Sequence, residues 1–161
     1  MAAPYLQNVS GDAALITKVC SRTPQFDYCY VCIQGDATRD KEDVKGLARQ
    51  SITCSGIQTL YVYNDFDNLL KNATDPTFKK TCILCKEFIL GALYNVGEAR
   101  QSFRDGDYKD ASIRLEVSIA NYNRCDEAIK KVCPPISQEL RMNLDKVKGF
   151  YEVAIAILFQ I

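Results

Sequence analysis

The chain contains no histidine and no tryptophan, and its formal net charge is zero. Without histidine, Ser-His-Asp and Cys-His catalysis, His-ligated zinc and the usual proton switch near neutral pH are excluded. The 20 basic and 20 acidic residues cancel, so no global field attracts nucleic acid or an anionic membrane. We therefore expect no catalytic residue, no metal or cofactor, and neither nucleic acid nor membrane as a partner.

Long apolar runs are also missing. The longest, residues 153–159, is far shorter than the roughly 18–20 residues of a membrane-spanning helix, and we interpret it as a buried carboxy-terminal turn. A charged-then-apolar signal segment is absent as well, so if the protein is secreted we expect this chain to be its mature form. No segment has the alternation of a strand, and 161 residues predict a single domain over 1–161.

Cysteine, by contrast, is plentiful. There are eight cysteines beside only two methionines, an even number that favours disulfides and an oxidising compartment. Two sequons, which begin at Asn8 and Asn72, are compatible with glycosylation and secretion.

Residues 76–104 predict one long helix around which the rest of the chain packs. Eight residues recur there at alternating four- and three-residue steps and so share one face: Phe78, Cys82, Cys85, Ile89, Ala92, Val96, Ala99 and Phe103. Asp75 and Pro76 suit a helix start, and Gly106 marks a turn at the end. We interpret this helix as the centre of a bundle.

Three further helices are expected around it, over 43–68, 108–131 and 137–160. On the first, the predicted inner face consists of Val44, Leu47, Ser51, Cys54, Gln58 and Tyr61. Before them, residues 9–36 read as a helical hairpin that is broken at 22–25. The fold class is therefore all-α: a disulfide-bonded antiparallel four-helix bundle over 43–160 with an N-terminal helical hairpin.

The cysteine spacing suggests how the helices are joined. Cys20 and Cys29 lie on either side of the break in the hairpin. Cys85 and Cys125 each lie about twenty residues from the turn at Gly106, so antiparallel packing places them at nearly equal height.

Four cysteines remain, and two pairs are predicted for them: Cys82 with Cys133, and Cys32 with Cys54. Other connectivities stay open, since eight cysteines permit on the order of a hundred. The two C-x-x-C spacings also occur in zinc and redox sites. Apolar flanks and the lack of a predicted sheet favour structural disulfides instead.

Several short motifs together carry a family resemblance. They are Cys20-Ser-Arg-Thr-Pro24, Tyr28-Cys29, Asp43-Val-Lys-Gly-Leu-Ala48, Ala73-Thr-Asp-Pro76, Ala92-Leu93, Gly106-Asp-Tyr108 and Cys125-Asp-Glu127. Over nearly its whole length the chain resembles the plant family of pectin methylesterase and invertase inhibitors. The resemblance implies a four-helix bundle preceded by a helical hairpin. It also implies one disulfide inside the hairpin and one between the second and third bundle helices, which independently supports the pairs 20–29 and 85–125.

The resemblance also implies a non-catalytic inhibitor that is secreted to the cell wall or sent to the vacuole. Such proteins form a one-to-one complex with a carbohydrate-active enzyme, and some relatives are pollen allergens. In the pectin methylesterase branch, acidic residues follow the bundle cysteines. Glu87, Asp126 and Glu127 have that character here, whereas Gly91 and Tyr94 do not. We therefore predict contacts at these three residues and pectin methylesterase as the target.

The alternative target is acid invertase (beta-fructofuranosidase). Invertase inhibitors present a Pro-Lys-Phe motif at the turn before the third bundle helix. Here Lys109 is in register with the motif's lysine, but Asp107, Tyr108 and Asp110 surround it in place of the proline and phenylalanine. Asp107, Tyr108 and Lys109 are accordingly predicted as partner contacts of that branch.

Three other interpretations compete with inhibition. The acidic residues could form an ordinary solvated helix face. A helical bundle with disulfides can also carry an apolar ligand, although Leu, Ile, Phe and Tyr leave little room for a cavity. Glycoside hydrolysis would need paired carboxylates, and the candidates are Asp65 and Asp67. Displacement of a dye by fatty acids and turnover of pectin or sucrose distinguish the last two.

Overall fold

The computed structural model describes residues 5–34, 43–132 and 136–161, with side chains from residue 13 onward. These ranges contain six helices and no strand: α1 (Tyr5–Cys20), α2 (Phe26–Gln34), α3 (Val44–Asn72), α4 (Pro76–Arg104), α5 (Tyr108–Lys130) and α6 (Gln138–Leu158). The predicted all-α class is confirmed. Among the described residues, none of the helices combines the length and the hydrophobicity needed to cross a membrane.

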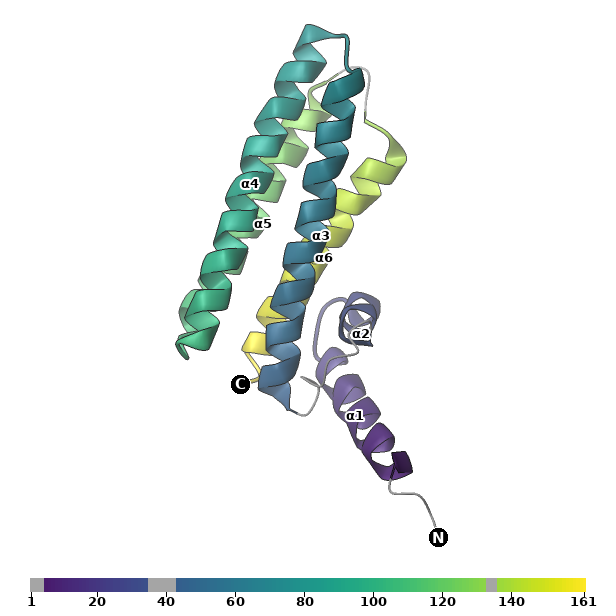
Figure 1. Cartoon of the computed structure of the whole chain (residues 1–161), viewed down its shortest axis with the longest axis vertical. Coiled ribbons are helices and arrows are strands. Elements are labelled where there is room, and N and C mark those ends of the chain that lie inside the picture. The colour runs from purple at the N-terminus through teal and green to yellow at the C-terminus, as the bar shows by residue number, and fades with distance from the viewer. Residues whose placement is uncertain (1–4, 35–42, 133–135) are drawn as a thin grey trace.

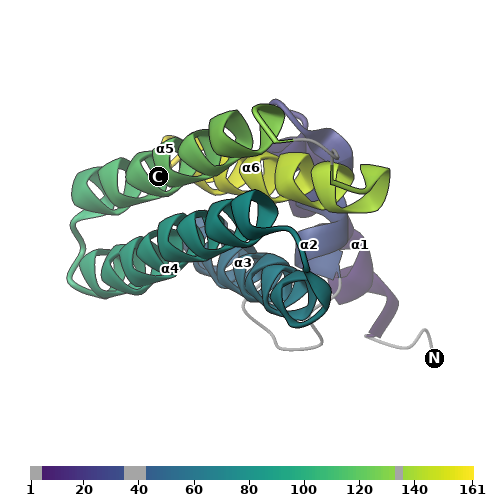
Figure 2. The same cartoon turned by 90° about the horizontal axis from the view of Figure 1, so that it is seen from above.

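Helices α3 to α6 run up, down, up and down as a four-helix bundle, as predicted (Figure 1). Each packs against the next along the chain, most extensively α4 against α5, and α6 returns to pack against α3. Viewed from above, the four helices lie side by side (Figure 2), and their buried residues form one hydrophobic core.

Side-chain caps fix where the bundle helices begin. The carboxylates of Asp43, Asp75 and Asp107 accept hydrogen bonds from the backbone N–H three residues on, at 2.7, 2.7 and 2.9 Å. Ser137 Oγ accepts in the same way from Leu140 N at 3.2 Å. These bonds satisfy amide donors that a helix start leaves unpaired. Helix α3 continues to Asn72, four residues beyond the predicted end.

The face predicted on α4 forms the centre of the core. Its six middle residues are buried, and Phe78 and Phe103 are half-buried at the two ends. On the opposite side, α6 buries a continuous apolar face that includes Leu144, Val147 and Tyr151. The sequence placed the α4 face correctly because its apolar residues repeat at three or four positions without interruption.

The predicted inner face of α3 is wrong beyond Ser51. Tyr61 is 59% exposed, and the residues that turn inward are Ser55, Thr59, Val62 and Phe66. Ser55 Oγ donates to the Ser51 carbonyl at 2.8 Å, and Thr59 Oγ1 donates to the Ser55 carbonyl at 2.7 Å. Because helix carbonyls satisfy these hydroxyls, small polar residues can lie in the core, where an apolar pattern does not reveal them.

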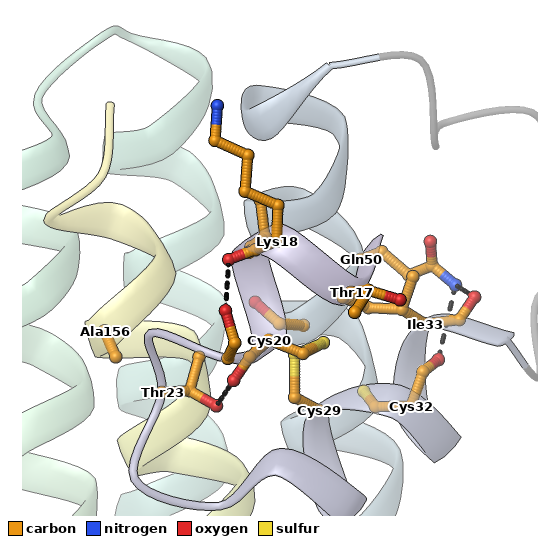
Figure 3. The surroundings of a disulfide bond; sticks show 12 residues. Thr17, Lys18, Cys20, Thr23, Cys29, Cys32, Ile33, Gln50 and Ala156 are labelled. Carbon is orange, nitrogen blue, oxygen red and sulfur yellow. Dashed lines mark hydrogen bonds between the residues drawn. A yellow bond between two sulfur atoms is a disulfide. The ribbon is translucent and has the colours of Figure 1, made fainter. Parts of the chain in front are cut away.

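The hairpin of α1 and α2 packs beside the lower half of the bundle in Figure 1, against α3 and α6. A disulfide joins Cys20 and Cys29 within it, and Thr23 Oγ1 donates to the Cys20 carbonyl at 2.8 Å to stabilise the turn (Figure 3). Gln50 of α3 donates from Nε2 to the carbonyl of Ile33 at 2.9 Å, near the end of α2. The hairpin is thus held by both side-chain and backbone contacts.

Two more disulfides join elements of the fold, Cys32–Cys54 between α2 and α3 and Cys85–Cys125 between α4 and α5. All three observed pairs coincide with pairs expected from the spacing. Cys82 is buried and forms no disulfide with a described residue, and burial raises the pKa of its thiol. Its predicted partner, Cys133, lies outside the described residues, so that pairing stays a prediction.

Candidate partner-binding surface

The six residues predicted to contact a partner lie in two separate places. Asp107, Tyr108 and Lys109 begin α5 at the α4–α5 turn. Glu87, Asp126 and Glu127 lie near the Cys85–Cys125 disulfide instead. At a rise of about 1.5 Å per residue, the twenty residues from Glu87 to Asp107 place the two groups roughly 30 Å apart along α4. A small contact surface could therefore include one group but not both.

At the turn, two of the three predicted residues support the fold. Gly106 has a positive φ of 81°, which a residue with a side chain rarely adopts, and Asp107 caps α5. Tyr108 is half-buried against Phe103, with ring centroids 5.3 Å apart, and Lys45 Nζ lies 5.7 Å from the Tyr108 ring centroid. Lys109 is exposed. Of the three, Lys109 is the residue that is best placed to reach a partner.

The acidic residues of the second group do not form one patch. The carboxylate of Asp126 is only 17% exposed and pairs with Lys130 at 2.8 Å. The hydrogen bond from Lys130 to Asp126 raises the pKa of Lys130, and the charge of Arg141 on α6 lowers it in part. Asp126 therefore belongs to the α5–α6 side, whereas Glu87 lines a groove with residues of α3. The structure does not bring Glu87 and Asp126 together.

That groove lies between α3 and α4. Its lining consists of Tyr63, Leu70, Ile83, Lys86, Glu87 and Leu90. Lys86 Nζ contacts Asp67 Oδ1 at 2.5 Å and lies 4.8 Å from the ring centroid of Tyr63. The hydrogen bond with Lys86 lowers the pKa of Asp67, and the same bond raises the pKa of Lys86. These two charges compensate each other, and Glu87 forms no ion pair with any described residue.

A row of exposed side chains continues from this groove along the outer side of α4. Ile83, Glu87, Leu90 and Tyr94 follow one another at steps of four, three and four residues, and we call them the outer α4 row. Ile83 is 51% exposed, Leu90 55% and Tyr94 65%. Large apolar groups that remain in contact with water along one face are typical of a docking surface.

The sequence pattern pointed to Glu87 in this row but not to Ile83 or Leu90. The signal was present, because α4 has a second apolar repeat on the side opposite the buried one. Leu84 adds to it at 40% exposure. When one buried face is assumed for each helix, apolar residues on the other face are not recognised as a surface feature. The two apolar sides of α4 thus have different roles, one in the core and one at the surface.

Of the two predicted glycosylation sites, Asn72 has a described side chain and Asn8 does not. Asn72 is exposed at the end of α3, where its Nδ2 donates to the Asn68 carbonyl at 3.3 Å. The side chain of Asn8 lies outside the described residues, although the backbone there is helical. Modification of either residue stays a prediction.

Comparison with known proteins gives consistent matches. Residues 14–157 match the family model described as plant invertase/pectin methylesterase inhibitor. A pectinesterase inhibitor of Actinidia deliciosa is 23% identical over 150 residues, which cover 93% of this chain and 80% of that protein. A putative invertase inhibitor of Platanus orientalis is 24% identical over 127 residues, with 76% and 75% covered.

Solved structures match in fold. The crystal structure of mutant form A of a pectin methylesterase inhibitor from Arabidopsis aligns with a TM-score of 0.77 at 14% identity, over 91% of this chain and 96% of that one. The structure of a pectin methylesterase inhibitor from Arabidopsis thaliana aligns with a TM-score of 0.68 at 15% identity, over 92% and 96%. At these identities the likeness establishes the helical fold.

Proposed function

The chain belongs to the plant invertase/pectin methylesterase inhibitor family, and on that premise we propose that it inhibits a pectin methylesterase. As a member of that family it is an inhibitor protein rather than an enzyme. In the proposed mechanism it covers the active-site cleft of the target in a one-to-one complex and performs no chemistry. The outer α4 row is the observation that carries this proposal, because it presents apolar side chains to water around an unpaired carboxylate.

The row suits steric occlusion for a physical reason. Apolar groups that leave water on binding supply a favourable free energy, and the charge of Glu87 restricts which surfaces can face the row. Cys85 lies two residues before Glu87, and its disulfide with Cys125 fixes α4 against α5. A surface held rigid before binding loses less conformational entropy in the complex.

Secretion to the cell wall is part of the same proposal. Three disulfides join the hairpin, the hairpin to α3, and α4 to α5. Disulfides of this kind form and persist in oxidising compartments outside the cytosol. The sequon at Asn72 is exposed, which would allow a glycan to be attached during secretion.

A second candidate target is acid invertase. The observation that favours it is the exposed Lys109 at the α4–α5 turn, which is in register with the lysine of the invertase-inhibitor motif. Its neighbours Asp107 and Tyr108 are occupied with the helix cap and with Phe103, so the turn presents one cation rather than a three-residue motif. For this reason we place pectin methylesterase first.

Titration of both enzymes in parallel tests the proposal. The purified protein is added in steps to a fixed amount of a plant pectin methylesterase and, separately, of an acid invertase. We expect the pectin methylesterase activity to fall and level off at one equivalent, with invertase unchanged. Loss of invertase activity alone would establish the second candidate. If neither enzyme is inhibited at a large excess of the protein, both proposals are wrong.

A further inference from the structure

A pocket rich in arginine lies between α3 and α4, near the end of α4 that leads into the α4–α5 turn (Figure 1). Its lining consists of Arg49, Ile52, Thr53, Arg100, Phe103 and Arg104. The 17 residues from Glu87 to Arg104 correspond to roughly 25 Å along the helix. The pocket is therefore separate from the groove at Glu87 and has the opposite charge.

Contacts with α3 hold Arg100 in place. Its Nη2 donates to the Thr53 carbonyl at 3.5 Å. A Cβ at position 56 would lie 3.4 Å from that same nitrogen, so the guanidinium passes close over Gly56. The Nε of Arg100 is buried and has no hydrogen-bond partner among the described residues. A buried donor that lacks an acceptor is unfavourable, and an acceptor bound in the pocket would relieve it.

The charges of Arg100 and Arg104 are not cancelled within the described structure. None of the ion pairs formed there involves Arg100 or Arg104. Arg104 Nη2 donates to Gln101 Oε1 at 2.5 Å, and Gln101 Nε2 in turn donates to both carboxylate oxygens of Asp105. Asp105 is thus joined to Arg104 only through an amide, which leaves the other N–H groups of that guanidinium available.

We propose that this pocket binds a small oxyanion, presented as a carboxylate or a phosphate group. The planar guanidinium of arginine donates parallel hydrogen bonds that match either group. Arg100 and Arg104 of α4 line the same space, so both can donate to one bound oxyanion. Ile52 and Phe103 supply apolar walls that reduce access of water and thereby strengthen the attraction between the charges. Inhibition of a target enzyme at the outer α4 row does not depend on this site.

Titration calorimetry on the full chain tests this site. Inorganic phosphate and citrate are the two probes, each added at an ionic strength held constant with sodium chloride. We expect saturable binding at one site. Arg100→Gln and Arg104→Gln should each weaken it by about tenfold, because each removes a charged hydrogen-bond donor. Arg124→Gln, which removes an equal charge from an exposed position on α5, should leave it unchanged.

The comparison of the two probes identifies the ligand. Binding of phosphate alone assigns a phosphate-bearing ligand, binding of citrate alone assigns a carboxylate, and binding of both assigns a general oxyanion site. Circular dichroism verifies the helical content of each variant. If Arg100→Gln does not fold, the loss of binding in Arg104→Gln tests the proposal, because Arg104 is exposed and its substitution should not disturb the fold. Absence of saturable binding by the wild type, or an equal loss in Arg124→Gln, overturns the proposal.

Discussion

At the scale of single residues, Gly149 allows the hairpin to dock on α6. A Cβ at this position would lie only 2.4 Å from Cδ2 of Tyr28, closer than any ordinary contact. The Tyr28 ring also packs against Phe150, with centroids 5.3 Å apart. The absence of a side chain at position 149 is therefore what lets an aromatic ring of α2 pack directly on the backbone of α6.

Gly149→Ala should consequently destabilise the protein by about 1–3 kcal/mol, the usual cost of overpacking a close contact. Urea unfolding followed by circular dichroism measures the change. Gly97→Ala is the matched control, since a Cβ there has no neighbour within 4 Å and α4 would gain up to about 1 kcal/mol of helix propensity. Equal effects of the two substitutions would contradict this account of Tyr28.

The ion pair of Asp67 and Lys86 predicts how stability depends on pH. Because the pKa of Asp67 is lowered in the folded state, its contribution is present above the unfolded pKa of about 3.9 and is lost as the pH falls through the folded pKa. Asp67→Asn should therefore lower the Tm between pH 5 and 7. The difference from the wild type should shrink below about pH 4.

Thermal melts at a series of pH values provide that measurement. Asp145→Asn serves as the control, because the carboxylate of Asp145 is 65% exposed in its pair with Lys148 and such pairs contribute little. A Tm difference for Asp67→Asn that persists unchanged to pH 2 would show that the ion pair is not its cause.

In the core, Thr59 Oγ1 and the Tyr151 hydroxyl are 2.6 Å apart. Burial raises the pKa of Tyr151, so its hydroxyl stays neutral. Tyr151→Phe should cost about 1 kcal/mol, because Thr59 keeps its bond to the Ser55 carbonyl. Urea unfolding measures this loss. A loss above about 3 kcal/mol would contradict this account, because it would exceed the contribution of one hydrogen bond between Tyr151 and Thr59.

At the scale of helices and their connections, the Cys32–Cys54 disulfide joins the hairpin to the bundle. The double substitution Cys32→Ala, Cys54→Ala should speed amide hydrogen exchange in α1 and α2 while exchange in α4 and α5 stays slow. The substitution of Cys85 and Cys125 by alanine is the matched comparison. It should affect the whole bundle and cost about 4 kcal/mol, since that disulfide closes a loop of 40 residues. Equal exchange patterns in the two variants would contradict this division.

The helices were predictable where one apolar repeat coincided with clear end signals. For α4, Asp75, Pro76 and Gly106 gave both ends, and the same turn gave the height of Cys85 relative to Cys125. The inner face of α3 was not predictable, because Ser55 and Thr59 are buried through bonds to their own helix. Nor was the contact of Tyr28 with Gly149, which joins residues far apart in the chain.

The candidate site was likewise predictable only in part. Acidic residues could be chosen from the sequence, but neither their exposure nor the side of the bundle that each faces could be predicted. The structure places Glu87 beside α3 and pairs Asp126 with Lys130 on α5. Which apolar side of a helix is buried and which stays exposed depends on the neighbouring helices that cover it. Only the packed bundle shows this.

At the scale of the whole molecule, the outer α4 row should determine inhibition. Leu90→Asp places a charge in the proposed contact and should weaken inhibition of pectin methylesterase by at least about tenfold, because a desolvated charge would lack a partner. Met142→Asp is the control, since Met142 is 63% exposed on α6, away from the row. Similar inhibition by the two variants would remove the outer α4 row from the binding surface.

The most direct test of inhibition by occlusion is the steady-state kinetics of a pectin methylesterase at several fixed concentrations of this protein. A protein that covers the cleft competes with the substrate, so the account predicts that the apparent KM rises with inhibitor concentration while kcat stays constant. A fall in kcat at constant KM would contradict it, because the inhibitor would then bind without excluding the substrate.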